Sequence, residues 1–247
     1  MALLTEDTVR RMSDNGTRGP VVVSRGEVLT PGARDFLAAH KIQVVYPQGT
    51  EEGGSGGQAP ARYQTPFGAG LEHKPEHMTH LRGNTLVFKD HPRIAFRGMI
   101  DALEAEILLT QQAAADYPGL VEELEEELAF VRRCIRFDVL DEPVGELSLC
   151  GYDAGALREY SHYPEKHLGQ PHFLPSHTDS PALLAVNRLR TLARRTELAA
   201  YAAFRDADGG VARGDIILGL NRLSSLMWIQ MIKLKAGQYE HASHHRS

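Results

Sequence analysis

Several groups of polar residues have the types and the spacing to bind an anion. The densest consists of Arg190, Arg194, Arg195 and Glu197. In a helix, Arg190 and Arg194 share one face, and Glu197 follows Arg194 by three residues. Guanidinium groups with one carboxylate can hold a phosphate, or they can form ion pairs with acids on a neighbouring helix. The sequence alone leaves both interpretations open.

A second group surrounds the start of a helix that the sequence predicts from Pro92. Lys89 precedes this helix, and Arg93 and Arg97 lie four residues apart on one of its faces. The free N–H groups at a helix N-terminus attract negative charge, so nearby cations suit an anion such as a triphosphate. The alternative interpretation is a solvated basic face.

Two further positions place polar side chains within apolar stretches. Asn221 begins a polar run inside an otherwise apolar helix, where asparagine is unfavourable and needs a partner. The alternative to a functional role there is a hydrogen bond between helices. Asp101 lies among apolar residues, and a buried carboxylate needs a cation. Arg190 is one candidate for this cation.

Three histidines lie close together, His73, His77 and His80. Their spacing allows two or three of them to reach one metal ion. However, Pro75 and the loop context give no fixed helical geometry, and no cysteine supports them. A solvated loop without a metal ion is therefore the prediction.

Helical periodicity from about residue 84 onward predicts the bundle that positions these residues. We expect an all-α domain over residues 84–240, with long helices, one short helix and no strands between them. The long helices begin near Pro92, Pro118, Ala182 and Ile216, and the short one covers 153–160.

The residues before the bundle differ in composition. Residues 1–47 contain two short apolar runs around a helix capped by Thr30, which indicates a small α/β appendage. Residues 48–83 begin with a stretch rich in glycine, proline and polar residues and are predicted to be a flexible linker. A polar tail, 241–247, is predicted to be disordered.

Composition excludes some classes of protein. Of the 247 residues, 42% are hydrophobic and 24% are charged, and the net charge of −5 does not attract nucleic acid. No apolar run approaches the roughly 18 residues of a membrane span. The N-terminus lacks the apolar core of a secretory signal, and Cys134 and Cys150 fit two buried thiols. We therefore expect a cytoplasmic protein or one in a compartment filled from the cytoplasm.

Together these motifs resemble the ATP:corrinoid adenosyltransferases, and particularly the ethanolamine-utilisation type. Lys89, Gly98 and Asp101 are in the register of the first bundle helix of that family. Residues 190–197 resemble its Arg-Thr-x-x-Arg-Arg-x-Glu pattern, and residues 221–224 resemble its Asn-Arg-Leu-Ser signature. The segments LTPGARDFLAAHKIQVV, THL and DHPRIAFRG are similar to the ethanolamine branch, so the likeness covers nearly the whole chain except the glycine-rich stretch.

The resemblance implies a five-helix bundle with a small N-terminal α/β appendage, assembled as a homotrimer with ATP and corrinoid between subunits. It implies transfer of the 5′-deoxyadenosyl group of ATP to the cobalt of cob(I)alamin, giving adenosylcobalamin and triphosphate. ATP, Mg²⁺ and cobalamin are the implied ligands. An electron-donating corrinoid reductase and a cobalamin-dependent lyase are the implied partners, and a bacterial microcompartment is the possible location.

The resemblance also implies roles for particular residues of the nucleotide site. Lys89 would hold the triphosphate. Arg194, Glu197 and Asn221 would bind ATP, with Arg195 nearby. Since cob(I)alamin is itself the nucleophile, the enzyme needs no general base and acts by orientation and electrostatics.

Other residues would order the site or act on the corrinoid. Asp101 and Arg190 would form the salt bridge that orders the site. His172 and Phe173 would belong to the loop that removes the lower axial ligand of the cobalt. The sequence leaves the choice between His172 and Phe173 open, and plain core packing is the alternative for Phe173.

Two departures from the family and two rival functions accompany this interpretation. Only residues 82–85 echo the glycine-rich phosphate loop of the propanediol-type branch, and the cysteine-rich metal motif of some ethanolamine-type members is missing before the THL segment. One rival function is a non-catalytic corrinoid carrier or microcompartment scaffold. The other is a helical interaction module with the appendage as a docking tag.

Overall fold

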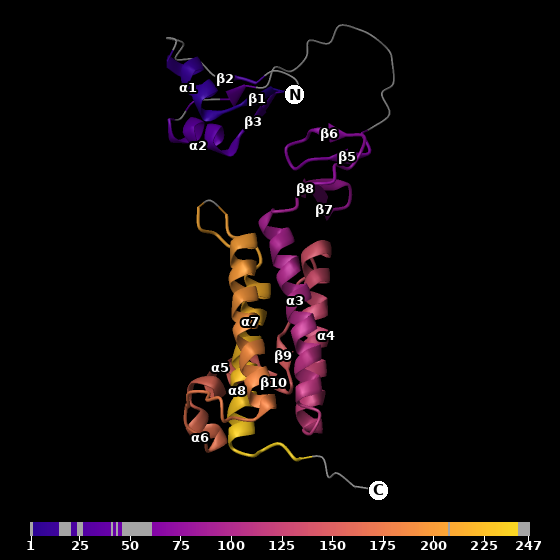
Figure 1. The fold of residues 1–247 in the computed structure, drawn as a ribbon, viewed down its shortest axis with the longest axis vertical. Helices are drawn as coiled ribbons and strands as arrows, with labels where there is room; N and C mark the ends of the chain where they lie inside the picture. The colour runs from indigo at the N-terminus through magenta and orange to yellow at the C-terminus, as the bar shows by residue number, and fades with distance from the viewer. Residues whose placement is uncertain are drawn as a thin grey trace. The chain divides into compact units, whose positions relative to one another are not determined.

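The computed structural model describes residues 2–14, 21–23, 27–40, 42, 44–45, 61–206 and 208–241. The chain forms two compact units, Met1–Gln58 and Ala59–Ser247, each with a core of its own (Figure 1). Residues 48–60 of the predicted linker and residues 242–247 of the predicted tail lie outside the described residues.

The first unit combines short strands with two helices. Its elements are β1 (Ala2–Leu4), α1 (Glu6–Asp14), β2 (Val21–Val22), β3 (Glu27–Leu29), α2 (Pro31–Ala39) and β4 (Val44–Val45). β1 pairs with β3 and β2 pairs with β4, both in parallel. The hydroxyl of Thr30 accepts a hydrogen bond from the N–H of Ala33 at 3.3 Å, which caps α2.

The second unit is built on long helices that lie side by side in Figure 1. Within the described residues they are α3 (Pro92–Ala113), α4 (Pro118–Leu140), α7 (Pro181–Phe204) and α8 (Gly214–Lys235). α7 packs against both α3 and α8, and α3 also packs against α4. A proline at the first turn starts α3, α4 and α7, as their sequences predict. None of the described helices is long and apolar enough to cross a membrane.

The connection between α4 and α7 holds more structure than predicted. It contains β9 (Ser148–Leu149), β10 (Tyr152–Asp153), α5 (Ala154–His162) and α6 (Pro164–Leu168). β9 and β10 form a hairpin around Cys150 and Gly151, whose φ angles of 50° and 79° suit a tight two-residue turn. The prediction of one short helix and no strands is therefore wrong here. Pro164 starts a second short helix, and the hairpin adds two strands of two residues each.

A small sheet precedes α3 and corrects the predicted linker. It consists of β5 (Tyr63–Gln64), β6 (Gly70–Leu71), β7 (Met78–Arg82) and β8 (Thr85–Phe88), in the order β6-β5-β8-β7. β7 and β8 form a hairpin that turns at Gly83, where φ is 53°. Met78, Leu86 and Val87 are buried. Flexibility was wrongly predicted for these residues because the glycines and prolines hide two short strands.

Asp138 near the end of α4 joins this sheet to the bundle. Its carboxylate is fully buried and accepts hydrogen bonds from Arg93 Nε at 2.8 Å and Arg97 Nε at 2.7 Å. Arg97 also donates to the carbonyl of Leu81 in β7 at 2.8 Å. Arg93 and Arg97 are therefore structural ion-pair partners within the chain, and neither the anion site nor the solvated face predicted from the sequence describes them.

His91 caps the N-terminus of α3 and makes the stability of the bundle depend on pH. Its Nδ1 accepts a hydrogen bond from the N–H of Arg93 at 3.2 Å, which requires a neutral ring at that atom. Burial, and then the positive charge of Arg93, lower the pKa of His91. The capping contribution is therefore present above the unfolded pKa of about 6.5 and is lost as the pH falls through the lower folded pKa.

We expect the His91→Asp variant to remove this dependence, because a carboxylate caps the helix without a proton at either pH. From about pH 7.5 to about pH 5.5, the wild-type protein should lose up to about 1 kcal/mol more unfolding free energy than the variant. Urea unfolding followed by the fluorescence of Trp228, the single tryptophan, measures this in the bundle. Equal losses in both proteins would show that His91 does not titrate in this way.

Candidate functional site

Two polar helix faces meet along α7 and α8. On α7, Arg190, Arg194 and Glu197 follow one another at intervals of four and three residues, and on α8, Asn221 and Trp228 lie two turns apart. The helices run antiparallel, so Asn221 meets Glu197 while Trp228 meets Arg190 (Figure 1). We call these five residues the α7–α8 strip.

At one end of the strip, hydrogen bonds link both helices. Glu197 accepts from Arg194 Nη1 at 2.5 Å and from Asn221 Nδ2 at 3.0 Å. Arg222 donates to the Asn221 amide oxygen and to the carbonyl of Ala154. The side chain of Glu197 is 13% exposed, whereas that of Arg194 is 48% exposed. A buried carboxylate therefore fixes a guanidinium that still faces solvent, and this end of the strip carries a net positive charge.

In the other half of the strip, Arg190 has an unused hydrogen-bond donor. One of its terminal nitrogens donates to Asn187 at 3.1 Å, and its guanidinium lies 5.6 Å from the ring centre of Trp228. Its Nε is buried without a hydrogen-bond partner in the chain. Burial, and then the like charge of Arg194, lower the pKa of Arg190. Because buried donors are rarely left unpaired, this Nε is an uncompensated polar group at the centre of the strip, while the residue as a whole stays partly exposed.

The loop between α6 and α7 covers Trp228 with aromatic rings. The His172 ring stacks at 5.8 Å from the Trp228 ring and at an interplanar angle of 18°. The Phe173 ring stacks at 5.4 Å and 20°. Next to them, Leu174 is 92% exposed. The single tryptophan is thus the platform on which the loop rests, and the loop presents an apolar side chain to solvent.

An ion pair with α8 anchors the same loop. Lys235 binds the Asp179 carboxylate at 2.5 Å, and its ammonium lies 5.5 Å from the centre of the Phe173 ring. Asp179 also accepts from the N–H of Ser176 at 2.7 Å. These hydrogen bonds, that of Lys235 first, lower the pKa of Asp179. Lys235 therefore holds both the base of the loop and one of its aromatic residues.

We expect the Lys235→Ala variant to expose this loop to proteases. The change leaves Asp179 without its cation and Phe173 without its cation–π contact. Limited chymotrypsin digestion should then cleave after Phe173 several times faster than in the wild type, while Lys235→Arg should stay close to the wild type. If Lys235→Ala is cleaved at the wild-type rate, the ion pair does not restrain the loop.

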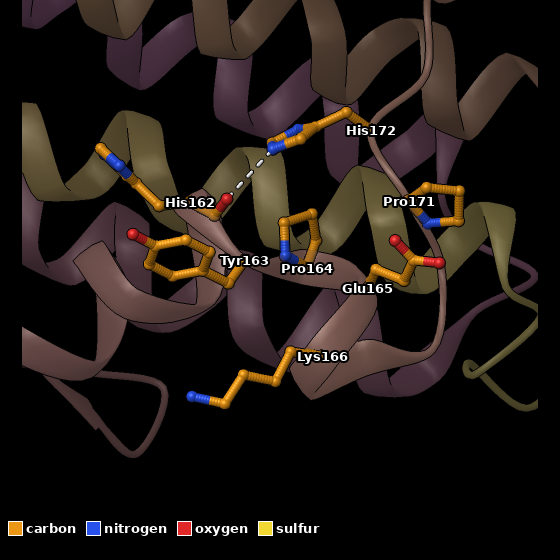
Figure 2. Close-up of a pocket in the computed structure, with 7 residues that line it drawn as sticks. All are labelled: His162, Tyr163, Pro164, Glu165, Lys166, Pro171 and His172. Atoms are coloured by element: carbon orange, nitrogen blue, oxygen red, sulfur yellow. Dashed lines mark hydrogen bonds between the residues drawn. The ribbon is translucent and has the colours of Figure 1, made fainter.

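A shallow hollow lies beside the aromatic loop. Figure 2 shows it between α5, α6 and the chain that leads into the loop. Its volume is about 590 Å³. His172 stands at its edge and is bonded through Nε2 to the carbonyl oxygen of His162 at 3.2 Å. The hollow is lined by His162, Tyr163, Pro164, Glu165, Lys166, Pro171 and His172.

The structure brings together most, but not all, of the residues proposed from the sequence. Six of the proposed residues belong to the strip or stack on its Trp228: Arg190, Arg194, Glu197, Asn221, His172 and Phe173. Lys89, Asp101 and Arg195 have no hydrogen bond or ion pair with the strip among the described residues. Lys89 is instead paired with Glu76 at 3.2 Å, and Arg195 is exposed.

Asp101 corrects a prediction. It is exposed, not buried, because Ile100 and Leu103 of the same helix fill the core. No ion pair joins Asp101 to Arg190 within the described chain. The apolar neighbours of Asp101 in the sequence belong to the inner face of α3, and the carboxylate lies on the outer face.

The histidines before α3 pack against aromatic rings. His77 lies 5.7 Å from the ring centre of Phe88, and His80 lies 5.6 Å from that of Tyr63. Among the residues that the structure describes, no group of three or more histidines, cysteines or acids is arranged to hold a metal ion.

Sequence reasoning missed two residues that organise the site. Trp228 supports the loop and Arg190. The sequence could have indicated it, because Trp228 lies two helical turns after Asn221 on the same face of the helix. Lys235 anchors the loop, but its partner Asp179 is 56 residues away in the sequence and no local pattern links the two.

The fold and the strip define a helical-bundle protein with a cationic surface beside an aromatic platform. Comparison with known families assigns the protein to one of them. The family model described as cobalamin adenosyltransferase matches residues 71–234, and the chain belongs to this family.

Two curated relatives are the corrinoid adenosyltransferases EutT of Salmonella typhimurium (strain LT2) and Escherichia coli (strain K12). Each is 35% identical to this chain over 162 residues, which are 64% of this chain and 59% of the relative. The chain thus matches less than two thirds of the length of these relatives. A solved variant of the PduO-type ATP:corrinoid adenosyltransferase from Lactobacillus reuteri, complexed with cobalamin and ATP, is 21% identical with a TM-score of 0.48, over 70% of this chain and 94% of its own.

Proposed function

We propose that this protein transfers the 5′-deoxyadenosyl group of ATP to the cobalt of cob(I)alamin, giving adenosylcobalamin and triphosphate. Its family and the names of its EutT relatives support this reaction. The observation that carries it is the α7–α8 strip, in which Glu197 holds Arg194 and Asn221 next to the aromatic platform at Trp228. The strip offers cations for a polyphosphate, and the loop stacked on Trp228 offers apolar side chains for a large ring.

In this reaction the cobalt of cob(I)alamin attacks the 5′ carbon of ATP. A cobalt–carbon bond forms, the carbon–oxygen bond breaks, and triphosphate leaves with the electron pair. No proton has to be removed, so the side chains act by position and charge. We propose that Arg194 and Arg190 stabilise the charge of the leaving triphosphate. Glu197 and Asn221 orient the nucleoside.

We further propose that a homotrimer completes the site, with the nucleotide between neighbouring subunits. Arg190 Nε is buried without an acceptor, and Asp101 is an exposed carboxylate without a partner among the described residues. An Asp101–Arg190 salt bridge between two subunits, made through the exposed part of Arg190, would give Asp101 a cation. Lys89 and Arg195 are exposed and make no hydrogen bond or ion pair with the strip among the described residues, and we propose that they bind triphosphate from the subunit surface.

The aromatic loop is proposed to displace the lower axial ligand of cobalamin. Phe173 is half-buried between Trp228 and Lys235, whereas His172 is exposed at the rim. Phe173 thus fits the apolar wedge, and His172 fits its solvent-facing border. The exposed Leu174 adds apolar surface to the same loop.

Other parts of the proposal rest on the family resemblance. ATP is expected as its Mg²⁺ complex, an external reductase supplies the electron that makes cob(I)alamin, and a cobalamin-dependent lyase receives the product. Cytoplasm or a bacterial microcompartment is the proposed location.

Anaerobic turnover tests the reaction directly. The purified full chain is mixed with ATP, Mg²⁺ and chemically reduced cobalamin, and formation of adenosylcobalamin is followed by corrinoid absorbance. One triphosphate should be released for each adenosylcobalamin formed. Folded protein that leaves the absorbance unchanged and releases no triphosphate would reject the proposal.

A further inference from the structure

Apart from its edge residue His172, the hollow between α5, α6 and the aromatic loop has no role in the reaction proposed above. We infer that it binds the lower nucleotide of the corrinoid, a benzimidazole-type base with its ribose phosphate, after this nucleotide has left the cobalt. The inference rests on the proposed function and adds a substrate preference: complete corrinoids over those that lack the nucleotide.

The position of the hollow carries the first part of the argument. Its edge is His172, the same residue that stacks on Trp228 at 5.8 Å. The bond from His172 to the carbonyl of His162 fixes this edge between the strip and the hollow (Figure 2). A corrin ring seated over the aromatic platform therefore has the hollow at its rim, on the side of the loop that displaces its lower ligand.

The lining of the hollow suits a flat aromatic base. Pro164 is buried within it, while Tyr163 is 58% exposed. The ring contact of Tyr163 with His162 is a loose one, tilted at 6.4 Å between centroids. An exposed aromatic face beside proline rings binds a planar heterocycle by stacking and apolar burial. The volume of about 590 Å³ accommodates a base with its ribose phosphate.

Charge adds little to this site. Lys166 stands on one side and Glu165 on the other (Figure 2), and the Lys166 side chain is 67% exposed and already paired with Glu159 at 3.0 Å. An exposed, paired lysine contributes weakly to binding a phosphodiester. Stacking on Tyr163 is therefore the main contribution, and Tyr163 is the residue to change.

The adenine nucleotide has similar chemistry, but it is assigned to the strip. Glu197 and Asn221 lie on α7 and α8, whereas the hollow lies on α5 and α6 beyond the His172 edge. A change at Tyr163 should therefore alter the KM for the corrinoid and leave the KM for ATP unchanged.

The test compares Tyr163→Ala with its matched control Tyr163→Phe, which keeps the ring. Each protein is assayed with cobalamin and with cobinamide, the same corrin without the lower nucleotide. Tyr163→Ala should raise the KM for cobalamin roughly two- to tenfold, the range expected for a lost aromatic stack. The KM of Tyr163→Ala for cobinamide should match that of the wild type. Tyr163→Phe should match the wild type in its KM for cobalamin and in its KM for cobinamide.

A binding measurement separates this inference from the proposed reaction. Quenching of Trp228 fluorescence by the cob(II) forms gives dissociation constants without turnover. Tyr163→Ala should raise the dissociation constant of cobalamin by the same factor as its KM, and it should leave the dissociation constant of cobinamide unchanged. Equal effects on both corrinoids, no effect on either, or a change confined to the KM for ATP would overturn the inference even if turnover is normal. Selective weakening without turnover in any protein would keep the inference and reject the reaction.

Discussion

The Asn221→Ala variant should lose about two orders of magnitude in kcat/KM for adenosyl transfer, the scale seen when one preorganised polar group is removed from an active site. Asn221 donates to Glu197 at 3.0 Å and accepts from Arg222, so it joins the two helices of the strip. Without the amide, Glu197 keeps only Arg194. In the proposed site, the nucleoside would then lose a contact and the oriented carboxylate. Anaerobic kinetics with varied ATP measure the loss.

Gln111→Ala is the matched control for this variant. Gln111 also donates an amide N–H to a carboxylate of a neighbouring helix, Glu125 at 2.9 Å, but it lies outside the strip. Its activity should stay near that of the wild type. If Asn221→Ala turns over normally, the strip is not the nucleotide site. If even the wild type binds adenosylcobalamin without forming it, the protein is a corrinoid carrier.

The Asp138→Asn variant should cost about 3–5 kcal/mol of unfolding free energy, as expected when one partner of a buried ion pair is removed. Its carboxylate is fully buried against Arg93 and Arg97, whose side chains are only 23% and 17% exposed. The neutral amide leaves two poorly solvated guanidinium groups without a counter-charge. Urea unfolding monitored by Trp228 reports the loss in the bundle unit.

Asp141→Asn provides the comparison for Asp138, three residues further along the chain. Asp141 pairs with Arg82 at 3.8 Å and Arg213 at 3.5 Å, but its side chain is 61% exposed. Asp141→Asn should lower the unfolding free energy by less than about 1 kcal/mol, as for other exposed ion pairs. Similar losses in both variants would mean that burial of Asp138 does not set the energy of this cluster.

The sequence predicted the long helices well because each combines a strong start signal with a sustained apolar face. Pro92 and Pro118 are the first residues of α3 and α4, and the apolar stripe after Ile216 lies in α8. Periodicity over several turns has few structural alternatives. Short elements lack that redundancy, so the two-residue strands β5 and β6 were hidden by neighbouring glycines and prolines.

The candidate site was predictable only where one helix carried its members at fixed spacing. Arg190, Arg194 and Glu197 share a face of α7 by sequence interval alone, and the structure places Asn221 beside them. Asp101 shows the limit of such reasoning. Apolar neighbours in a helix do not bury a residue, because the side chains of successive residues point about 100° apart around the axis.

Arg93 and Arg97 show a second limit, that of long-range pairing. Their partner Asp138 is more than 40 residues away in the sequence, as the separations of 45 and 41 residues show. No local pattern distinguishes a basic face that binds a ligand from one that binds a distant carboxylate. Only the packing of α3 against α4 makes the distinction.

The separation of the chain into two cores also bears on how such a protein can change over generations. The buried cluster around Val9 and Leu37 and the cluster around Phe96 and Leu220 have no residue in common. A substitution in one core therefore needs no compensating substitution in the other.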